Sequence, residues 1–165
     1  MSARLYYDSP IGLIEIEGTD AGVSAIRFAD ERSESTDTVP TVLFACKHQL
    51  DEYFKGLRTQ FDIKLDLSSA TAFYREVWRL VRSIPHGHTR SYSDIAVTIG
   101  RPNATRAVGQ ANGHNPIPIV IPCHRVIGKN GRLTGYAYGL GIKRALLALE
   151  NPSRYQQQAS LFVSR

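Results

Sequence analysis

Residues 115–127 read NPIPIVIPCHRVI, a proline-rich apolar run that ends in a cysteine, a histidine and an arginine. Three prolines within seven residues exclude a helix interior and a central strand, because proline lacks the amide donor that both require. We therefore predict a stiff, extended segment that presents Cys123, His124 and Arg125 at its end. A cysteine is a strong nucleophile only as the thiolate, which a neighbouring base or cation favours, so this triplet is the first candidate for chemistry.

Whether the side chains of Cys123 and His124 can interact depends on the backbone between them. Consecutive side chains of an extended segment point to opposite faces, so a contact between them needs a turn, or a water molecule between the sulfur and the ring. A third group should orient the imidazole. Glu150 is the candidate, since it is one of three acidic residues in the second half of the chain and ends an otherwise apolar helix. The alternative is an exposed, helix-terminal glutamate.

Two short helices are predicted before this run. Residues 91–94, Ser-Tyr-Ser-Asp, form a capping-box pattern that opens the first helix, and Gly100 closes it. Pro102 can begin the second, which Gly113 ends. Two helices joined by a tight turn form a helix-turn-helix pattern, although such patterns also arise in helical proteins that bind no DNA. The outward face of the second helix carries side chains suited to phosphate or base contact, namely Asn103, Arg106 and Gln110.

Charge divides the chain near residue 70. Residues 1–69 hold 7 Lys and Arg against 12 Asp and Glu, a net charge of −5, whereas residues 70–165 hold 13 against 3, a net charge of +10. The basic half suits a polyanion such as DNA; a basic surface that serves only solubility is the alternative. We therefore divide the chain into a first domain of residues 1–70, a second domain of residues 71–152 and a tail of residues 153–165.

The first domain is predicted to be a small α/β unit. Alternating apolar residues around two turns predict three strands over residues 5–28, and apolar residues at helical spacing predict a helix over residues 39–57. Cys46 lies on that helical stripe, where a small buried side chain is the favoured interpretation over a reactive thiol. Residues 61–67 alternate again and predict one more strand. The second domain is predicted to be helical, with its last helix over residues 140–150.

Several classes of protein and site are disfavoured by the sequence. No apolar run approaches the ~20 residues of a membrane span, and the N-terminus lacks the apolar segment of a signal peptide. A cytoplasmic location follows as the default, with Cys46 and Cys123 as reduced thiols. No spacing of Cys and His is typical of a zinc site. His86 and His88 flank one glycine, so a metal pair there is the alternative to a solvated turn.

At residues 122–126, Pro-Cys-His-Arg-Val, the sequence resembles the active-site signature of the O6-alkylguanine-DNA alkyltransferases (methylated-DNA–protein-cysteine methyltransferases). The similarity is dense from about residue 73 to residue 150 and weaker before it. It includes matches in the same order on both sides of the signature, namely Ser91-Tyr92, Arg106 to Gly109, Asn115-Pro116, Thr134 to Tyr136 and Lys143 to Glu150. The resemblance implies an α+β fold: a small, ribonuclease-H-like N-terminal α/β domain with an antiparallel sheet and a helix, then a mainly helical, winged-helix-like domain with a helix-turn-helix.

The resemblance also implies a role for each site residue. Cys123 would take the alkyl group, His124 would accept the thiol proton through a water molecule, and Glu150 would hold the imidazole. Tyr92 would donate to the departing guanine, and Asn115 would fix the hinge before the signature. The residues implied in DNA binding are Arg106, Ala107, Gln110, Ala111 and Arg125. Those implied in the base pocket are Val126, Tyr136, Ala137, Tyr138 and Lys143.

The function implied by the resemblance is direct-reversal DNA repair. One alkyl group, typically methyl, would move irreversibly from O6 of guanine, or O4 of thymine, in a flipped-out base. The implied partner is double-stranded DNA that contains O6-alkylguanine, with cooperative self-association on DNA as a further hypothesis. The resemblance implies no metal, no cofactor and no membrane, and it places the protein in the cytoplasm with the nucleoid.

One position departs from the family pattern. The loop after Tyr136 usually carries glycine where this chain has Tyr138. A bulky ring there predicts a narrower pocket that accepts benzyl-sized groups poorly, whereas a ring that points outward would leave the pocket unchanged.

Three other functions stay open at this point. They are a non-catalytic module that binds alkylated DNA, a helix-turn-helix regulator and a cysteine hydrolase. Relatives that only bind damaged bases replace the nucleophilic cysteine, so Cys123 argues against the first. A regulator would not need the rigid delivery of Cys123, and a hydrolase would turn over repeatedly.

Overall fold

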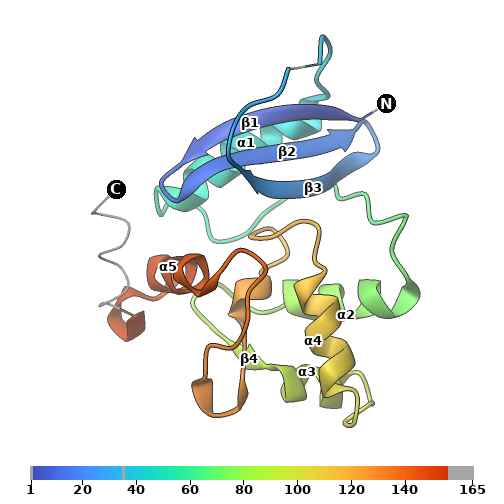
Figure 1. Ribbon diagram of the computed structural model, residues 1–165, viewed down its shortest axis with the longest axis vertical. Helices are drawn as coiled ribbons and strands as arrows, with labels where there is room; N and C mark the ends of the chain where they lie inside the picture. Colours follow the sequence, from blue (N-terminus) through green and yellow to red (C-terminus); the bar gives the residue numbers. More distant parts are fainter. Residues whose placement is uncertain (1, 35, 156–165) are drawn as a thin grey trace. The chain divides into compact units, whose positions relative to one another are not determined.

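The structure is a computed structural model that describes residues 2–34 and 36–155. The chain divides after Ser68 into two compact units, whose elements are labelled in Figure 1. Within the described ranges, no helix is both long enough and apolar enough to cross a membrane.

The first unit is a three-stranded antiparallel sheet with one helix on its apolar face. β1 (Ala3–Ser9), β2 (Gly12–Thr19) and β3 (Gly22–Ala29) pair in sequence order. α1 (Thr41–Phe54) packs along the sheet (Figure 1). The apolar side chains that alternate along β2 are fully buried, because every second residue of a strand faces the same side. The predicted meander and helix are thus confirmed.

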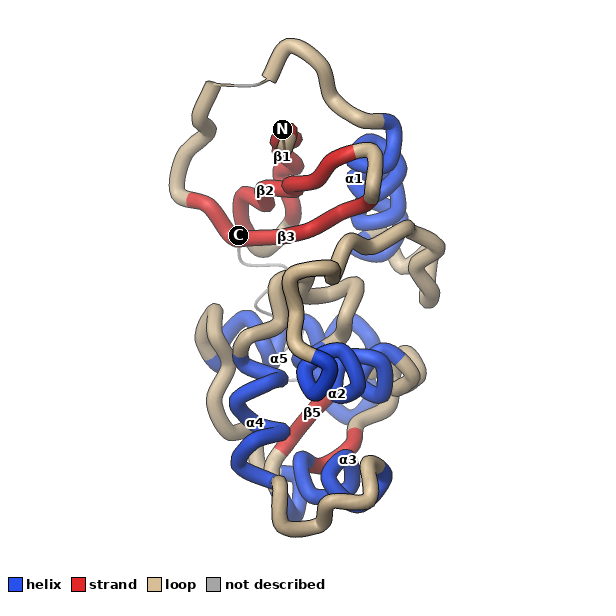
Figure 2. The backbone as a smooth tube through the Cα atoms, turned by 90° about the vertical axis from the view of Figure 1, so that its right-hand side faces the viewer, coloured by secondary structure: helices blue, strands red, loops and turns tan. Residues whose placement is uncertain are grey.

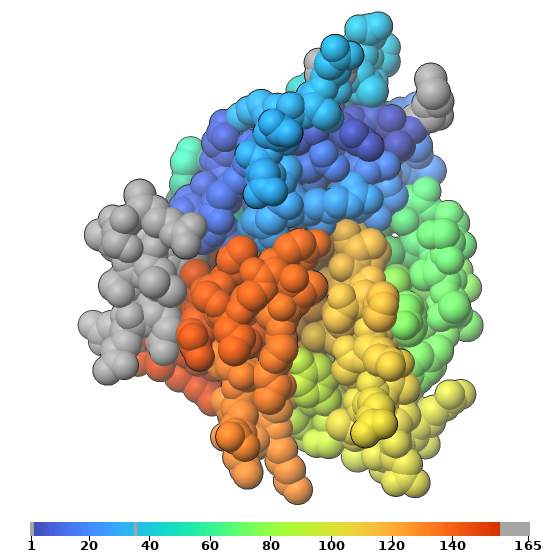
Figure 3. All heavy atoms as spheres, viewed as in Figure 1, coloured from blue at the N-terminus to red at the C-terminus, as the bar shows by residue number. Residues whose placement is uncertain are grey.

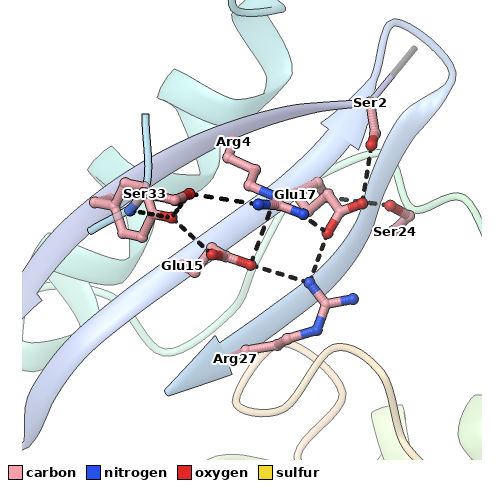
Figure 4. A network of polar contacts seen from close by, with 8 residues as sticks. Ser2, Arg4, Glu15, Glu17, Ser24, Arg27 and Ser33 are labelled. Atoms are coloured by element: carbon pink, nitrogen blue, oxygen red, sulfur yellow. Dashed lines mark hydrogen bonds and ion pairs between the residues drawn. The ribbon is translucent and has the colours of Figure 1, made fainter. Parts of the chain in front are cut away.

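The opposite face of this sheet carries charged side chains that pair with one another. Figure 4 shows Arg27 donating to Glu15 at 3.1 Å and to Glu17 at 2.6 Å. The Tyr6 hydroxyl donates to Glu15 at 2.8 Å, and Arg4 lies 4.0 Å from both carboxylates. Opposite charges on neighbouring strands stabilise a sheet modestly. The alternation of β2, apolar on one face and acidic on the other, therefore fixes the register of the sheet.

The strand predicted over residues 61–67 was wrong. That segment forms one isolated bridge, in which the amide of Val23 donates to Lys64 O at 2.9 Å and the amide of Asp66 donates to Val23 O at 2.8 Å. The approach is close: a Cβ atom on Gly22 would lie 2.8 Å from Lys64 O. The alternation of residues 61–67 therefore reflects one buried side of an extended segment, with too few backbone pairs to make a ladder.

The second unit is mainly helical. Its helices are α2 (Ala72–Arg82), α3 (Tyr92–Thr98), α4 (Thr105–Gly113) and α5 (Leu140–Glu150). α3 and α4 pack against each other and against α2 (Figure 2). Ser91 and Asp94 exchange side-chain and backbone hydrogen bonds at the start of α3, so the predicted capping box is confirmed. α4 begins later than predicted, because the amide of Ala104 closes a turn on Arg101 O.

A parallel pair of two-residue strands joins distant parts of this unit. β4 (Arg90–Ser91) pairs with β5 (Val126–Ile127). β4 directly precedes Tyr92, and β5 directly follows the segment that contains Cys123, so the pairing brings these two residues toward one site. The pairing was not predicted, because two residues are too few to display the alternation of a strand.

The predicted tail differs at its start from the expectation. Residues 152–155 are helical, and the Asn151 side chain accepts from the Arg154 amide at 3.3 Å, a side-chain cap that supports a helical turn. The rest of the predicted tail, residues 156–165, lies outside the described residues.

Candidate active site

The proline-rich run before Cys123 folds back on itself and is not fully extended as predicted. The amide of Ile121 donates to Ile117 O at 2.9 Å, and Ile119 between them has a φ of 74°. A positive φ is strained for a β-branched residue, and Ile119 is almost completely buried. The surrounding packing therefore holds a reversal that the prolines alone do not predict.

Cys123 begins a short 3-10 turn, Cys123–Arg125, directly after Pro122. Pro122 has φ −80° and ψ 65°, the geometry of an inverse γ-turn, and the amide of Cys123 donates to Ile121 O at 2.7 Å. A 3-10 turn has about three residues per turn, so three consecutive side chains leave it in three directions. The turn that the pairing of Cys123 and His124 required is therefore present.

Two buried asparagines hold this turn in place. Asn115 donates to Ile121 O at 2.7 Å and accepts from the amide of Ile117 at 2.9 Å, which ties the two ends of the reversal together. Asn112, on α4, donates to Cys123 O at 3.2 Å. The resemblance had implied a role for Asn115 but none for Asn112, although a polar residue beside the apolar face of a predicted helix was a usable signal.

His124 and Arg125 both bind the carboxylate of Glu150. His124 Nε2 lies 3.0 Å from each Glu150 oxygen, and Arg125 donates to the same carboxylate from Nε at 2.8 Å and from Nη2 at 2.7 Å. Because a carboxylate only accepts hydrogen bonds, His124 carries a proton on Nε2. His124 Nδ1 is buried and has no hydrogen-bond partner among the described residues, so its lone pair is available in the neutral ring.

The assignment of Arg125 to DNA binding was wrong. The residue as a whole is only 5% exposed, and the remaining nitrogen of its side chain, Nη1, donates to Ile84 O at 2.7 Å. The reason is that α5, which ends in Glu150, packs against the turn and places its carboxylate within reach of Arg125. Glu150 is likewise a buried partner of both side chains, and not an exposed helix-terminal glutamate.

Burial and charge act in opposite directions on the two ionisable groups of this site. Burial raises the pKa of the Cys123 thiol, although hydrogen bonds with Asn115 and Tyr136 and the charge of Lys143 act against it. Burial also acts to raise the pKa of Glu150, but His124 and Arg125 outweigh it and hold that pKa below its ordinary value. At neutral pH the resting site therefore holds a protonated thiol and an ionised carboxylate, so an attack by sulfur requires a base.

Cys123 opens into a pocket of about 290 Å³, at the small end of the range of ligand pockets. In Figure 3, α4 and the segment after β5 stand on either side of a recess, with residues of α3 at its base. The predicted site residues that line the pocket are Tyr92, Asn115, Cys123, Tyr136, Ala137 and Tyr138. Thr134 and Gly135, from the loop that the resemblance included, also line the pocket. The lining residues that the sequence did not single out are Gly109, Asn112 and Gly113.

Val126 and Lys143 were assigned to the pocket wall, and the structure places them behind it. The fully buried Lys143 donates from Nζ to Val126 O at 2.7 Å and to the carbonyls of Thr134 and Gly135 at 3.3 Å. Burial lowers the pKa of Lys143 to about 8. The lysine therefore ties the pocket loop to β5 and does not itself line the pocket.

The outer face of α4 presents a polar surface. Arg106 and Gln110 are exposed and Ala107 is half-buried. Ala111, which was assigned to the DNA surface, is completely buried, and its carbonyl accepts from Trp78 Nε1 at 2.7 Å. That assignment was wrong because Ala111 lies on the side of α4 that packs on α2.

The histidines around residue 87 form a turn. The amide of His88 donates to Pro85 O at 3.0 Å, and His88 Nδ1 lies 3.1 Å from His86 O. In the part of the chain that the structure describes, no group of three or more His, Cys, Asp or Glu side chains is arranged to hold a metal ion.

Two family models cover most of the chain. Residues 72–152 match the DNA-binding domain of 6-O-methylguanine DNA methyltransferase, and residues 4–67 match the ribonuclease-like domain of the same proteins. The chain belongs to the 6-O-methylguanine DNA methyltransferase family. The first unit is thus the ribonuclease-like domain of this family, and the unit that contains Cys123 is its DNA-binding domain.

Relatives within the 6-O-methylguanine DNA methyltransferase family are similar over nearly their whole length. The methylated-DNA–protein-cysteine methyltransferase of Mycolicibacterium paratuberculosis is 52% identical over 87% of this chain and 88% of its own length. The crystal structure of Mycobacterium tuberculosis O6-methylguanine methyltransferase superposes with a TM-score of 0.82 at 45% identity, over 92% of this chain and 94% of that chain. The crystal structure of Mycobacterium tuberculosis OGT in complex with DNA gives a TM-score of 0.81 at 46% identity, over 95% and 97%.

Proposed function

We propose that this chain repairs alkylated DNA directly, by moving an alkyl group from O6 of guanine to Sγ of Cys123. The position of Cys123 carries the proposal: its thiol borders a pocket of about 290 Å³, in the turn that also holds His124 on Glu150. The reaction is the one that the names of the relatives describe.

The first step is removal of the thiol proton. Because Nε2 of His124 donates to Glu150, Nδ1 is the nitrogen that can accept the Cys123 proton, through one bridging water molecule. Glu150 then stabilises the imidazolium that forms, as the carboxylate of a catalytic triad does. This makes the sulfur a thiolate only when the reaction takes place.

The second step is an in-line displacement at the alkyl carbon. The thiolate electron pair forms the S–C bond, and the electron pair of the C–O6 bond stays on guanine. Tyr92 lines the pocket and donates a proton to the departing ring, and the proton from Cys123 finally restores that phenol. The product is a thioether, which thiol exchange does not reverse, so each chain reacts once. The balance requires no cofactor, and O4-alkylthymine would react in the same way.

The target base must leave the duplex, because its O6 atom is stacked inside. Flipping costs a few kcal/mol and is least costly for a damaged pair. We propose that α4 enters the minor groove, where the small Ala107 side chain allows close approach. Arg106 would fill the space that the flipped nucleotide leaves, and Gln110 would contact the same groove. A protein with this task works on the chromosome, so we propose a cytoplasmic location on the nucleoid.

Mass spectrometry of the reacted protein tests this proposal. Duplex DNA that carries one O6-methylguanine is expected to add one methylene mass to the peptide that contains Cys123, with at most one transfer per chain. The DNA should be recovered with unmodified guanine. Repeated turnover on ester substrates would instead identify a cysteine hydrolase, and an unmodified Cys123 with persistent lesions would refute the proposal.

Tyr138 is expected to restrict the size of the transferred group. Its ring lines the pocket and lies edge-on to Tyr136, with ring centroids 5.9 Å apart. Tyr138→Gly should raise the rate of reaction with free O6-benzylguanine by roughly 10-fold or more, since a bulky group in an undersized pocket loses ~1–3 kcal/mol. Reaction with O6-methylguanine should change far less. Tyr138→Phe, which keeps the ring, is the matched control, and equal changes for both groups would contradict a steric role.

Binding to undamaged duplex is expected to depend steeply on salt. Of the twelve Lys and Arg side chains in the described part of the second unit, ten are exposed and two, Arg125 and Lys143, are buried. If about four of the exposed ones contact phosphates, affinity should fall roughly 100-fold between about 50 and 200 mM salt. Fluorescence anisotropy with two unrelated duplexes measures this, and an affinity that is insensitive to salt would exclude binding through phosphates.

A further inference from the structure

We propose that Arg125 is a positioning residue that keeps His124 neutral before the reaction, by balancing the charge of Glu150. The inference rests on the proposed function, in which His124 takes the proton of Cys123. In this proposal Arg125 acts on proton transfer from inside the protein, and not through a contact with DNA.

Arg125 and His124, two side chains of different kinds, both bind the carboxylate of Glu150. Arg125 approaches both of its oxygens, from Nε at 2.8 and 3.2 Å and from Nη2 at 2.7 Å, whereas His124 offers a single N–H to them. The Glu150 side chain is 1% exposed, that of His124 is 0% exposed and that of Arg125 is 6% exposed. The three groups therefore form a buried cluster in which water does not balance the charges.

An unpaired charge inside a protein costs much free energy. A buried cluster therefore holds its protons in the arrangement whose total charge is zero. With Arg125 present, the arginine and the carboxylate sum to zero, so His124 is neutral and its Nδ1 is free to accept a proton. Without Arg125, the cluster reaches zero only by keeping an extra proton, on His124 or on Glu150. A His124 that already carries this proton cannot act as a base toward Cys123.

Arg125 is also anchored independently of the carboxylate. Its Nη1 atom donates at 2.7 Å to the carbonyl oxygen of Ile84, which lies two residues after the end of α2. Glu150 is the last residue of α5, where the partial negative charge of the helix end disfavours an anion. The guanidinium of Arg125 offsets this unfavourable interaction, and it holds the Glu150 carboxylate in the geometry that orients His124.

Other titratable groups lie near the cluster. Cys123 precedes His124 in the turn, and Lys143 and Tyr136 lie near Cys123. His86, in the turn after α2, experiences the charges of Glu150, Arg125 and His124. Burial lowers the pKa of His86 below the ordinary value of an imidazole, and a change in its charge would act on the same cluster, so the experiment must separate its effect from that of His124.

The test is the pH profile of the single methyl transfer, measured between about pH 6 and 9 for duplex and for free O6-methylguanine. Arg125→Met should slow both reactions at neutral pH by roughly 10-fold or more, and the rate should recover as the pH rises. Its acid limb should move upward by about one pH unit or more. Arg125→Lys, which keeps the charge but loses the two-point contact, should fall between wild type and Arg125→Met. The profile of His86→Gln should keep the acid limb of wild type.

The double variant Arg125→Met/Glu150→Gln separates charge balance from structure. The introduced glutamine is neutral and its carbonyl oxygen still accepts from His124, so the acid limb should return toward that of wild type even if the rate stays low. Two results would overturn the inference. One is an Arg125→Met pH profile with the same shape as that of wild type, differing only by a constant factor in rate. The other is a double variant whose acid limb stays at the higher pH of Arg125→Met. If Arg125→Met does not fold, Arg125→Lys and the double variant carry the test. If wild type itself leaves Cys123 unmodified, the proposed function fails instead.

Discussion

Cys123→Ser is expected to abolish alkyl transfer and to leave duplex binding unchanged. A serine hydroxyl loses its proton far less readily than a thiol, and the neutral oxygen is a weak nucleophile. The substitution is small, and Cys123 is buried in a turn held by hydrogen bonds that involve its backbone amide and carbonyl, so the fold should persist. Mass spectrometry after incubation with O6-methylguanine duplex should find no added methylene, while anisotropy gives the affinity of wild type within about twofold.

Cys46→Ser is the matched control for this result. Cys46 is completely buried in α1, and burial raises its pKa to about 12, so it supplies no thiolate at neutral pH. Transfer by folded Cys46→Ser should equal that of wild type. Full transfer by Cys123→Ser would move the nucleophile to another residue and remove the basis of the proposed function.

Arg106→Ala is expected to slow repair of duplex by roughly 10- to 100-fold and to leave reaction with free O6-methylguanine nearly unchanged. The duplex reaction includes base flipping, which costs a few kcal/mol, and each 1.4 kcal/mol corresponds to about tenfold. Arg106 is exposed on α4, where its side chain can fill the space left in the duplex. A free base needs no flipping, so it bypasses this contribution.

The control for Arg106 is Arg79→Ala, which removes an exposed arginine from α2. Both variants lose one positive charge from the same unit, so a difference between them isolates the position of Arg106. Single-turnover rates on duplex and on free base should be measured side by side. If Arg106→Ala slows both reactions equally, its role is structural, and if Arg79→Ala matches it on duplex, only charge matters.

Local sequence patterns predicted much of the fold because they record interactions between near neighbours. The capping box at Ser91 and Asp94 and the alternation of β2 each follow from residues a few positions apart. The proline-rich run singled out Cys123 for the same reason. The predicted strand over residues 61–67 failed because a strand needs a partner, and only Val23 supplies one there.

The sequence did not predict the directions in which the side chains at the site point. The sequence named Cys123, His124 and Glu150, but it assigned Arg125 and Ala111 to the DNA surface, and both are buried. It also missed Asn112, which reaches the carbonyl of Cys123 from another element. These errors share one cause: which way a side chain points depends on the turn or helix face that carries it, and distant packing decides that.

The sequence alone therefore determined which chemical groups this protein has and where its longer helices and its three-stranded meander lie along the chain, because composition and local periodicity are properties of neighbouring residues. Only the tertiary structure decided that a 3-10 turn directs His124 and Arg125 onto one carboxylate 25 residues or more away, and that β4 and β5 bring Tyr92 toward the segment of Cys123. Contacts of that kind join residues far apart in the chain, and they form only when burial of the whole core compensates for the loss of chain entropy.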